Sequence, residues 1–167
     1  RRRSSHRRAI RPEETEMQEP ERIQPETLGD YLEIMSKAVF QSGISWKVVG
    51  AKWPGIKEAF QGFDAETVAD LAEPDIEALV QDTRVIRNRR KLEAIVYNAH
   101  RMLELDEQFG EFQRYIRSHG DFQSTLQDIR KQFKFMGDTG TYYFLHVVGE
   151  DVPTHGELVE SRISKPR

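Results

Sequence analysis

Residues 79–99 read LVQDTRVIRNRRKLEAIVYNA, and this stretch decides the fold class. An apolar helix end leads into a short turn rich in Arg and Asn, and an amphipathic helix follows. The apolar stripe of that second helix is formed by Leu92, Ile95, Val96 and Ala99. Five cations lie in and just after the turn, at Arg84, Arg87, Arg89, Arg90 and Lys91. Free N–H groups at a helix N-terminus beside such cations favour an anion such as a phosphate backbone, but a solvated basic helix start explains them equally well.

The rest of the chain from residue 25 onward also follows a helical period, and no segment shows a convincing two-residue alternation. The sequence therefore predicts an all-α protein. Thr27 and Asp64 are the expected N-caps of two helices, and Pro74 is the expected first-turn residue of another. Trp53-Pro54-Gly55 is expected to separate two short helices over 44–51 and 56–60. The other predicted helices cover residues 28–39, 65–71, 75–81, 88–109, 112–117, 126–132 and 139–148.

Composition limits the class of protein. The 167 residues suit one domain with extensions, and 37% hydrophobic residues suffice for a core. No apolar run approaches membrane length, and no signal peptide is expected, so we expect a cytoplasmic protein with no membrane partner. We also expect a monomer. The chain contains no Cys, and its five His are dispersed. We therefore expect no disulfide, no metal site and no cofactor.

Charge is distributed unevenly along the chain. The first eight residues, RRRSSHRR, hold five Arg and no acid, although the whole chain carries a net charge of −3. If the body of the protein binds nucleic acid, it must therefore do so through local basic patches rather than a global positive field. Three regions are expected: a basic and polar arm over 1–24, which we predict to be disordered or loosely draped, a helical domain over 25–150, and a C-terminal extension over 151–167.

A second informative stretch covers residues 133–149, FKFMGDTGTYYFLHVVG. A basic helix end with Lys134 leads to Gly137, which is expected to adopt a positive φ and let a foreign backbone approach. The Thr139 hydroxyl is expected to cap the next helix. Helix–hairpin–helix units hold a DNA phosphate with such hairpin amides, although a Gly-containing turn between helices is common.

Taken in order, FQSGISWKVV, the FxxFD pattern at 60–64, LVQDxxVIRNRRKLEAIVYNA and QFKFMGDTGTYYF resemble the 3-methyladenine DNA glycosylase I family. That family belongs to the helix–hairpin–helix DNA glycosylase superfamily, and the resemblance covers roughly residues 28–150. It implies an enzyme of base-excision repair that hydrolyses the N-glycosidic bond of an alkylated base in double-stranded DNA. An alternative from another class is a non-catalytic helix–hairpin–helix relative that binds DNA but has lost the glycosylase pocket.

The resemblance also implies two sets of site residues. The base pocket would contain Gln41, Ser45 and Trp46, and the base-reading glutamate of the family would fall at Ala38. A Trp46 indole would stack on a cationic alkylated purine, although Trp46 fits a plain core position about as well. The DNA phosphates would be bound by Arg87, Asn88, Arg89, Lys91, Lys134, Gly137 and Thr139.

The chain departs from the family pattern at several positions. Ala38 lacks the base-reading carboxylate, Phe40 replaces a second Gln, and the Cys and His ligands of the family zinc have no full counterpart. Asp138 places an acid in the hairpin itself. Substitute catalytic groups could be Glu33, Asp151 or His155, but a surface carboxylate or a loop histidine is the commoner role of each. We therefore expect weak or altered excision, which Ala38→Glu would raise if the pocket is otherwise intact.

Overall fold

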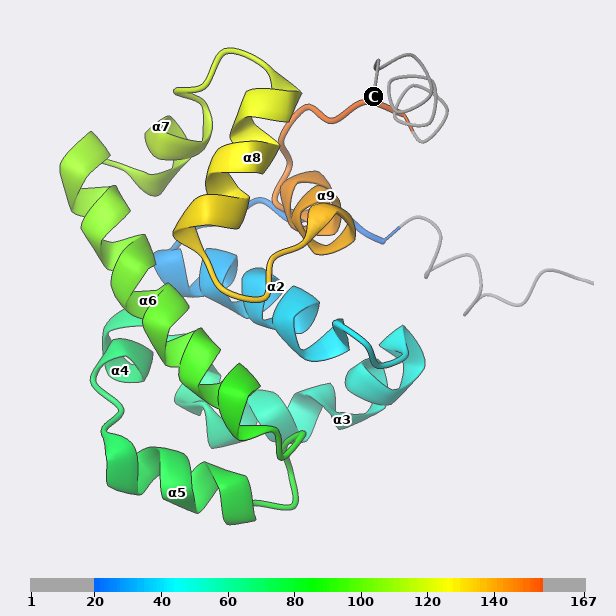
Figure 1. Ribbon diagram of the computed structural model, residues 1–167, viewed down its shortest axis with the longest axis vertical. Helices are drawn as coiled ribbons and strands as arrows, with labels where there is room; N and C mark the ends of the chain where they lie inside the picture. Colours follow the sequence, from blue (N-terminus) through cyan, green and yellow to red (C-terminus); the bar gives the residue numbers. More distant parts are fainter. Residues whose placement is uncertain (1–19, 155–167) are drawn as a thin grey trace, which may run out of the picture.

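The computed structural model describes residues 20–154, which form eight α-helices and one 3₁₀ turn, with no strand in that range (Figure 1). The predicted all-α class is confirmed. None of the helices within 20–154 has the length and apolar character that a bilayer crossing demands. The elements are α2 (Leu28–Gln41), α3 (Trp46–Ala59), η1 (Gln61–Phe63), α4 (Ala65–Ala69), α5 (Glu73–Gln81), α6 (Arg89–Phe109), α7 (Phe112–Ile116), α8 (Phe122–Gln132) and α9 (Asp138–Val147).

Helix α2 is the centre of the fold and packs against α6 and α9 (Figure 1). Helices α3 to α5 lie on one side of it, and α7 to α9 lie toward the other end of the long helix α6. The core is continuous across both sides, because aromatic side chains from α3, α7 and α9 contact aromatic rings of α2. The largest fully buried side chains include Leu32, Met35, Phe40, Phe60, Phe63, Leu92, Ile95, Phe112 and Phe144.

Side-chain caps fix the helix starts that the sequence predicted. Thr27 accepts a hydrogen bond from the Asp30 N–H, and the Asp30 carboxylate accepts from the Thr27 N–H, which completes a capping box. Asp64 caps α4 through the Thr67 N–H at 3.1 Å. Helix α6 ends at Gly110, which adopts a left-handed φ of 82°.

The predicted break at Trp53-Pro54-Gly55 is wrong, because α3 runs without interruption across Pro54. Proline in a helix interior costs about 3 kcal/mol through a lost hydrogen bond and a clash with the carbonyl one turn earlier. Burial on either side offsets that cost. Trp53 is 8% exposed and stacks on Phe63 with ring centroids 5.3 Å apart, and Ile56 is fully buried. Tertiary packing therefore overrides the local signal.

Helix α8 begins four residues before its predicted start at residue 126. Asp121 accepts a hydrogen bond from the Ser124 N–H at 2.7 Å and is the true N-cap. The sequence prediction missed this cap because the first turn of α8 is mostly polar.

Five residues of the predicted N-terminal arm, 20–24, lie along α9. The Ile23 N–H donates to the Val147 carbonyl at 2.7 Å, and Arg22 donates to the Glu150 carbonyl at 3.3 Å. Residues 1–19 and 155–167 lie outside the described part of the chain, so the three-region division stays a prediction.

Candidate functional site

The hairpin between α8 and α9 is anchored to α6 by one buried amide. Asn98 is 1% exposed, and its side chain donates to the Lys134 carbonyl at 3.1 Å and accepts from the Lys134 N–H at 2.8 Å. Phe135 then takes a positive φ of 59°, a strained conformation for a residue with a Cβ. The two hydrogen bonds between Asn98 and Lys134 therefore fix the backbone directly before the turn at Phe135.

The N-terminus of α9 differs in detail from its prediction. The helix begins at Asp138, Gly137 is its N-cap, and no side chain caps it, so the expected Thr139 hydroxyl cap is wrong. The expected positive φ at Gly137 is also wrong, since Gly137 is extended with φ −86° and Phe135 makes the turn instead. Gly137 and Thr139 are both exposed there. A helix start without a capping side chain can accept an anion from outside.

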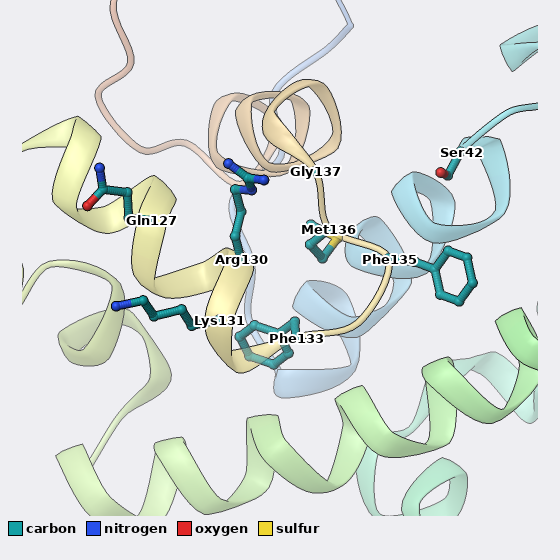
Figure 2. A pocket seen from close by; sticks show the side chains of 8 residues that line it. All are labelled: Ser42, Gln127, Arg130, Lys131, Phe133, Phe135, Met136 and Gly137. Atoms are coloured by element: carbon teal, nitrogen blue, oxygen red, sulfur yellow. The ribbon is translucent and has the colours of Figure 1, made fainter. Parts of the chain in front are cut away.

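One cation from α8, Arg130, lies beside this helix start. Arg130 donates to the Asp138 carboxylate at 2.9 Å, which places the guanidinium beside the first turn of α9 and offsets the negative charge of Asp138 (Figure 2). A cavity of about 510 Å³ opens between α8, the hairpin and the end of α2. Its lining combines exposed polar and cationic side chains with an apolar floor, and consists of Ser42, Gln127, Arg130, Lys131, Phe133, Phe135, Met136 and Gly137 (Figure 2).

The other predicted phosphate site, the turn before α6, has most of its cations occupied. Arg89 pairs with Glu73 at 2.9 Å, with Glu77, and with Glu93 at 3.7 Å. Arg84 pairs with Asp82 and Glu58. Asn88 is the N-cap of α6 and accepts from the Lys91 N–H at 3.2 Å. Arg87 and Arg90 are exposed and make no ion pair with any described residue.

Lys91 occupies a structural position. It is 4% exposed, and its ammonium donates to the carbonyls of Phe40 at 2.8 Å and Ser42 at 2.5 Å. These carbonyls belong to the C-terminal end of α2, where helix carbonyls lack intrahelical donors and attract a cation. Burial lowers the pKa of the Lys91 ammonium. This placement does not suit Lys91 for a phosphate contact.

The predicted base-pocket residues surround the start of α3. Ser45 caps α3 by accepting from the Val48 N–H at 3.2 Å. Trp46 is half-buried and packs on Tyr143, with ring centroids 4.3 Å apart. Gln41, also half-buried, is the last residue of α2. Ala38 is 1% exposed, and a Cβ placed on Gly140 would lie 3.4 Å from the Ala38 Cβ. Helices α2 and α9 are thus in close contact at the position of the family glutamate.

Among the candidate catalytic groups, Glu33 is close enough to Tyr143, the aromatic partner of Trp46, to affect the pKa of its hydroxyl. Its carboxylate accepts from the Trp53 indole at 2.9 Å and pairs with Lys57 at 3.1 Å. Burial, and then the charge of Glu33, raise the pKa of the neighbouring Tyr143 to about 12, so the Tyr143 hydroxyl is neutral at pH 7. Asp151 is exposed on the segment after α9. His155 lies outside the described residues.

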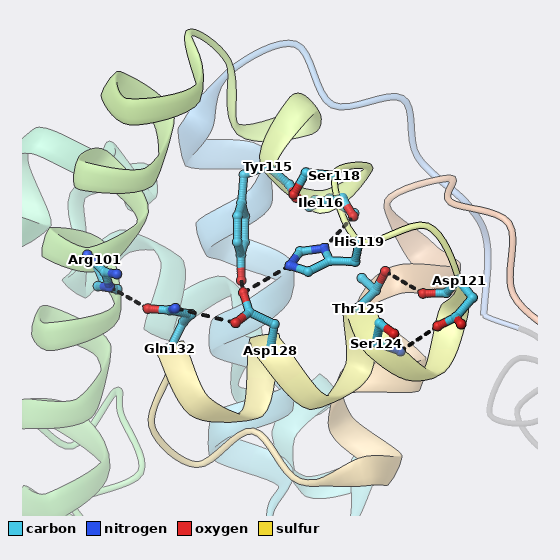
Figure 3. Close-up of polar contacts among 10 residues, drawn as sticks. All are labelled: Arg101, Tyr115, Ile116, Ser118, His119, Asp121, Ser124, Thr125, Asp128 and Gln132. Atoms are coloured by element: carbon cyan, nitrogen blue, oxygen red, sulfur yellow. Dashed lines mark hydrogen bonds and ion pairs between the residues drawn. The ribbon is translucent and has the colours of Figure 1, made fainter.

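A polar network that was not predicted from the sequence connects α8 to α6 and α7 (Figure 3). The Asp128 carboxylate accepts from the Tyr115 hydroxyl at 2.7 Å and contacts the His119 ring at 3.0 Å. Gln132 links the same network to Arg101 of α6 at 2.7 Å. The network joins α6, α7 and α8, and it holds the helix that carries Arg130 and Lys131.

The zinc site that the resemblance implies for the family does not fit this chain. There is no Cys, and residues 20–154 contain no group of three His, Asp or Glu side chains placed to hold a metal ion.

Comparison with known proteins identifies the family of this chain. The methyladenine glycosylase family profile matches residues 29–132. DNA-3-methyladenine glycosylase 1 of Escherichia coli and DNA-3-methyladenine glycosylase of Haemophilus influenzae are each 32% identical over 130 residues, covering 65% of this chain and 70% of the relative. The fold matches 3-methyladenine DNA glycosylase I from Staphylococcus aureus with a TM-score of 0.71 at 23% identity, over 84% of this chain and 87% of that one. This chain belongs to the methyladenine glycosylase family.

Proposed function

We propose that this chain is a DNA glycosylase of base-excision repair, which hydrolyses the N-glycosidic bond of alkylated bases in double-stranded DNA. The observation that carries the proposal is the α8–α9 hairpin. Asn98 fixes its backbone at Lys134, no side chain caps the N-terminus of α9, and Arg130 lies beside that N-terminus. A phosphate is the anion that such a hairpin suits in a family of DNA enzymes.

The exposed face of α6 connects this hairpin to the turn before α6. Arg90 and Tyr97 are seven residues apart and therefore share one face of the helix. Asn98, which holds Lys134, lies nine residues from the start of α6, or about 14 Å along the axis at 1.5 Å per residue. That distance equals about four base-pair rises of 3.4 Å. Arg87 and Arg90 could thus contact the duplex a few base pairs from the hairpin.

The chemistry requires the damaged nucleotide to leave the duplex and its base to be held by aromatic side chains. Trp46 is the predicted stacking surface, and the neutral Tyr143 hydroxyl lies on the ring packed against it. In hydrolysis of a 3-alkylated purine nucleotide, the C1′–N9 bond breaks and its electron pair neutralises the cationic base. Water then adds at C1′ and loses a proton. Because this base is an activated leaving group, some rate can survive without the family carboxylate.

The non-catalytic DNA-binding alternative is favoured by one specific observation. Ala38 provides no carboxylate, and its close contact with Gly140 leaves little space for one. A lost hydrogen bond to a charged group costs about 1.5–3 kcal/mol, or roughly one to two orders of magnitude in rate or selectivity. The non-catalytic alternative is correct if this protein releases the base no faster than the base is lost spontaneously.

Incubation with methylated duplex DNA, followed by chromatography of the free bases, tests the proposal. Release of a methylated base above the spontaneous rate, reduced by Trp46→Ala, supports the glycosylase. Salt-dependent binding to lesion or abasic duplex without any base release supports the non-catalytic alternative. A matched control is Lys47→Ala, since Lys47 is the exposed neighbour of Trp46 on α3.

A further inference from the structure

Lys134 is held twice by two consecutive residues of α6. Asn98 binds both backbone polar groups of Lys134, as described above. The neighbouring Tyr97 contacts its side chain, because the Lys134 Nζ lies 4.3 Å from the centroid of the Tyr97 ring. The Lys134 side chain is thus directed over α6 rather than left free in solvent.

Tyr97 itself is unusual for its exposure. Its side chain is 41% exposed, and only Ile23 and Val48 are other large apolar residues in that class within residues 20–154. The ring contributes little to the core, so burial does not explain it. The Tyr97 ring instead contacts the ammonium of Lys134, which lies in the hairpin. The position of the ring therefore suggests a role that depends on Lys134.

We propose that Tyr97 is a positioning residue, which holds the Lys134 ammonium on the exposed face of α6 for contact with a DNA phosphate. A cation over an aromatic face is attracted by the ring quadrupole, while its N–H groups remain available to an anion. A lysine whose side chain is already ordered loses less conformational entropy when it binds. This inference rests on the proposed function, since the phosphate belongs to the same DNA.

The alternative role for an exposed aromatic ring beside cations is direct stacking on a nucleobase. The two roles differ in their dependence on Lys134. A positioning residue loses its effect when Lys134 is removed, whereas a ring that stacks on DNA keeps its effect. A double-mutant cycle therefore separates them.

The experiment measures duplex DNA affinity against salt concentration for Tyr97→Phe, Tyr97→Leu, Lys134→Met and the Tyr97→Leu/Lys134→Met double variant. We expect Tyr97→Leu to weaken binding about two- to fivefold, the range of an exposed cation–π contact, and Tyr97→Phe to bind like the wild type. Lys134→Met should reduce the salt slope by about one, and the double variant should bind like Lys134→Met. As a matched control, Lys131→Met on α8 should combine additively with Tyr97→Leu.

A second readout uses the free protein. The Lys134 side-chain methylene protons should show an upfield ring-current shift by NMR, which Tyr97→Phe preserves and Tyr97→Leu removes. Wild-type affinity in Tyr97→Leu, or an equal loss from Tyr97→Leu with and without Lys134, would overturn the inference while DNA binding stands. Absence of DNA binding by the wild type would instead overturn the proposed function and this inference with it.

Discussion

Replacing Lys91 by Met separates a structural role from a DNA-binding role at one position. The sequence predicted a phosphate ligand, whereas the structure shows a buried ammonium bound to two carbonyls at the end of α2. Met retains most of the aliphatic stem and removes the charge and the donors. The carbonyls of Phe40 and Ser42 would then lose their charged partner.

The expected loss of stability follows from these contacts. Each of the two hydrogen bonds from the charged ammonium contributes about 1.5–3 kcal/mol, and a cation at a helix C-terminus adds about 0.3–1 kcal/mol. The desolvation that lowers the pKa of Lys91 offsets part of this gain. We therefore expect Lys91→Met to lower the free energy of unfolding by about 2–4 kcal/mol. For a domain of this size, the midpoint of thermal unfolding should fall by about 6–15 °C.

Thermal unfolding and DNA titration together test this reasoning. At a temperature well below the midpoint, the folded Lys91→Met variant should bind duplex DNA with the salt slope of the wild type. Arg90→Met is the matched control, because Arg90 is the exposed neighbour, and it should show the reverse: unchanged stability and a smaller salt slope. An unchanged midpoint with a reduced salt slope in Lys91→Met would refute the structural role.

Three further predictions concern the hairpin, the α8 network and the pocket. Asn98→Ala should speed hydrogen exchange at the Lys134 amide and weaken DNA binding, because the hairpin loses both anchoring bonds; unchanged exchange would contradict this. Burial acts to raise the pKa of Asp128, but hydrogen bonds from Tyr115 and His119 hold that pKa below the ordinary value of 3.8. The ionised Asp128 carboxylate therefore stabilises the fold above pH 3.8, and this stabilisation is lost as the pH falls below that value. Asp128→Asn should therefore lower the midpoint at pH 7 and flatten its decline in acid, as unfolding across pH would show. Ala38→Glu should lower the midpoint and leave base release no faster, since α9 crowds the site; faster release in a stable variant would show an open pocket.

The sequence predicted helix ends well at Thr27, Asp64 and Gly110, missed the Asp121 cap of α8, and failed where packing decides. Thr27, Asp64 and Gly110 each act within a few residues of their own position, so their patterns are local. Helix α3 continues across Pro54 because Trp53 and Ile56 are buried against residues from other elements. Such contacts cannot be derived from the local sequence.

The site residues likewise divide into those that the local sequence predicts and those whose contacts depend on packing. The sequence located both basic turns, but it could not reveal which cations already have partners. Glu73 and Glu77 of α5 pair with Arg89 only after α5 and α6 pack together, and Lys91 reaches carbonyls some fifty residues away in the chain. The roles proposed for Asn98 and Tyr97 were likewise missed, because they depend on a hairpin 36 residues later.

We propose that this chain removes alkylated bases with a pocket weakened at Ala38. The most direct test is the single-turnover rate of base release from a duplex containing one 3-methyladenine, measured beside the Escherichia coli relative. We predict release above the spontaneous rate, about 10- to 100-fold slower than that of the relative. A rate no faster than spontaneous loss would contradict the glycosylase activity, and a rate equal to that of the relative would contradict the weakened pocket.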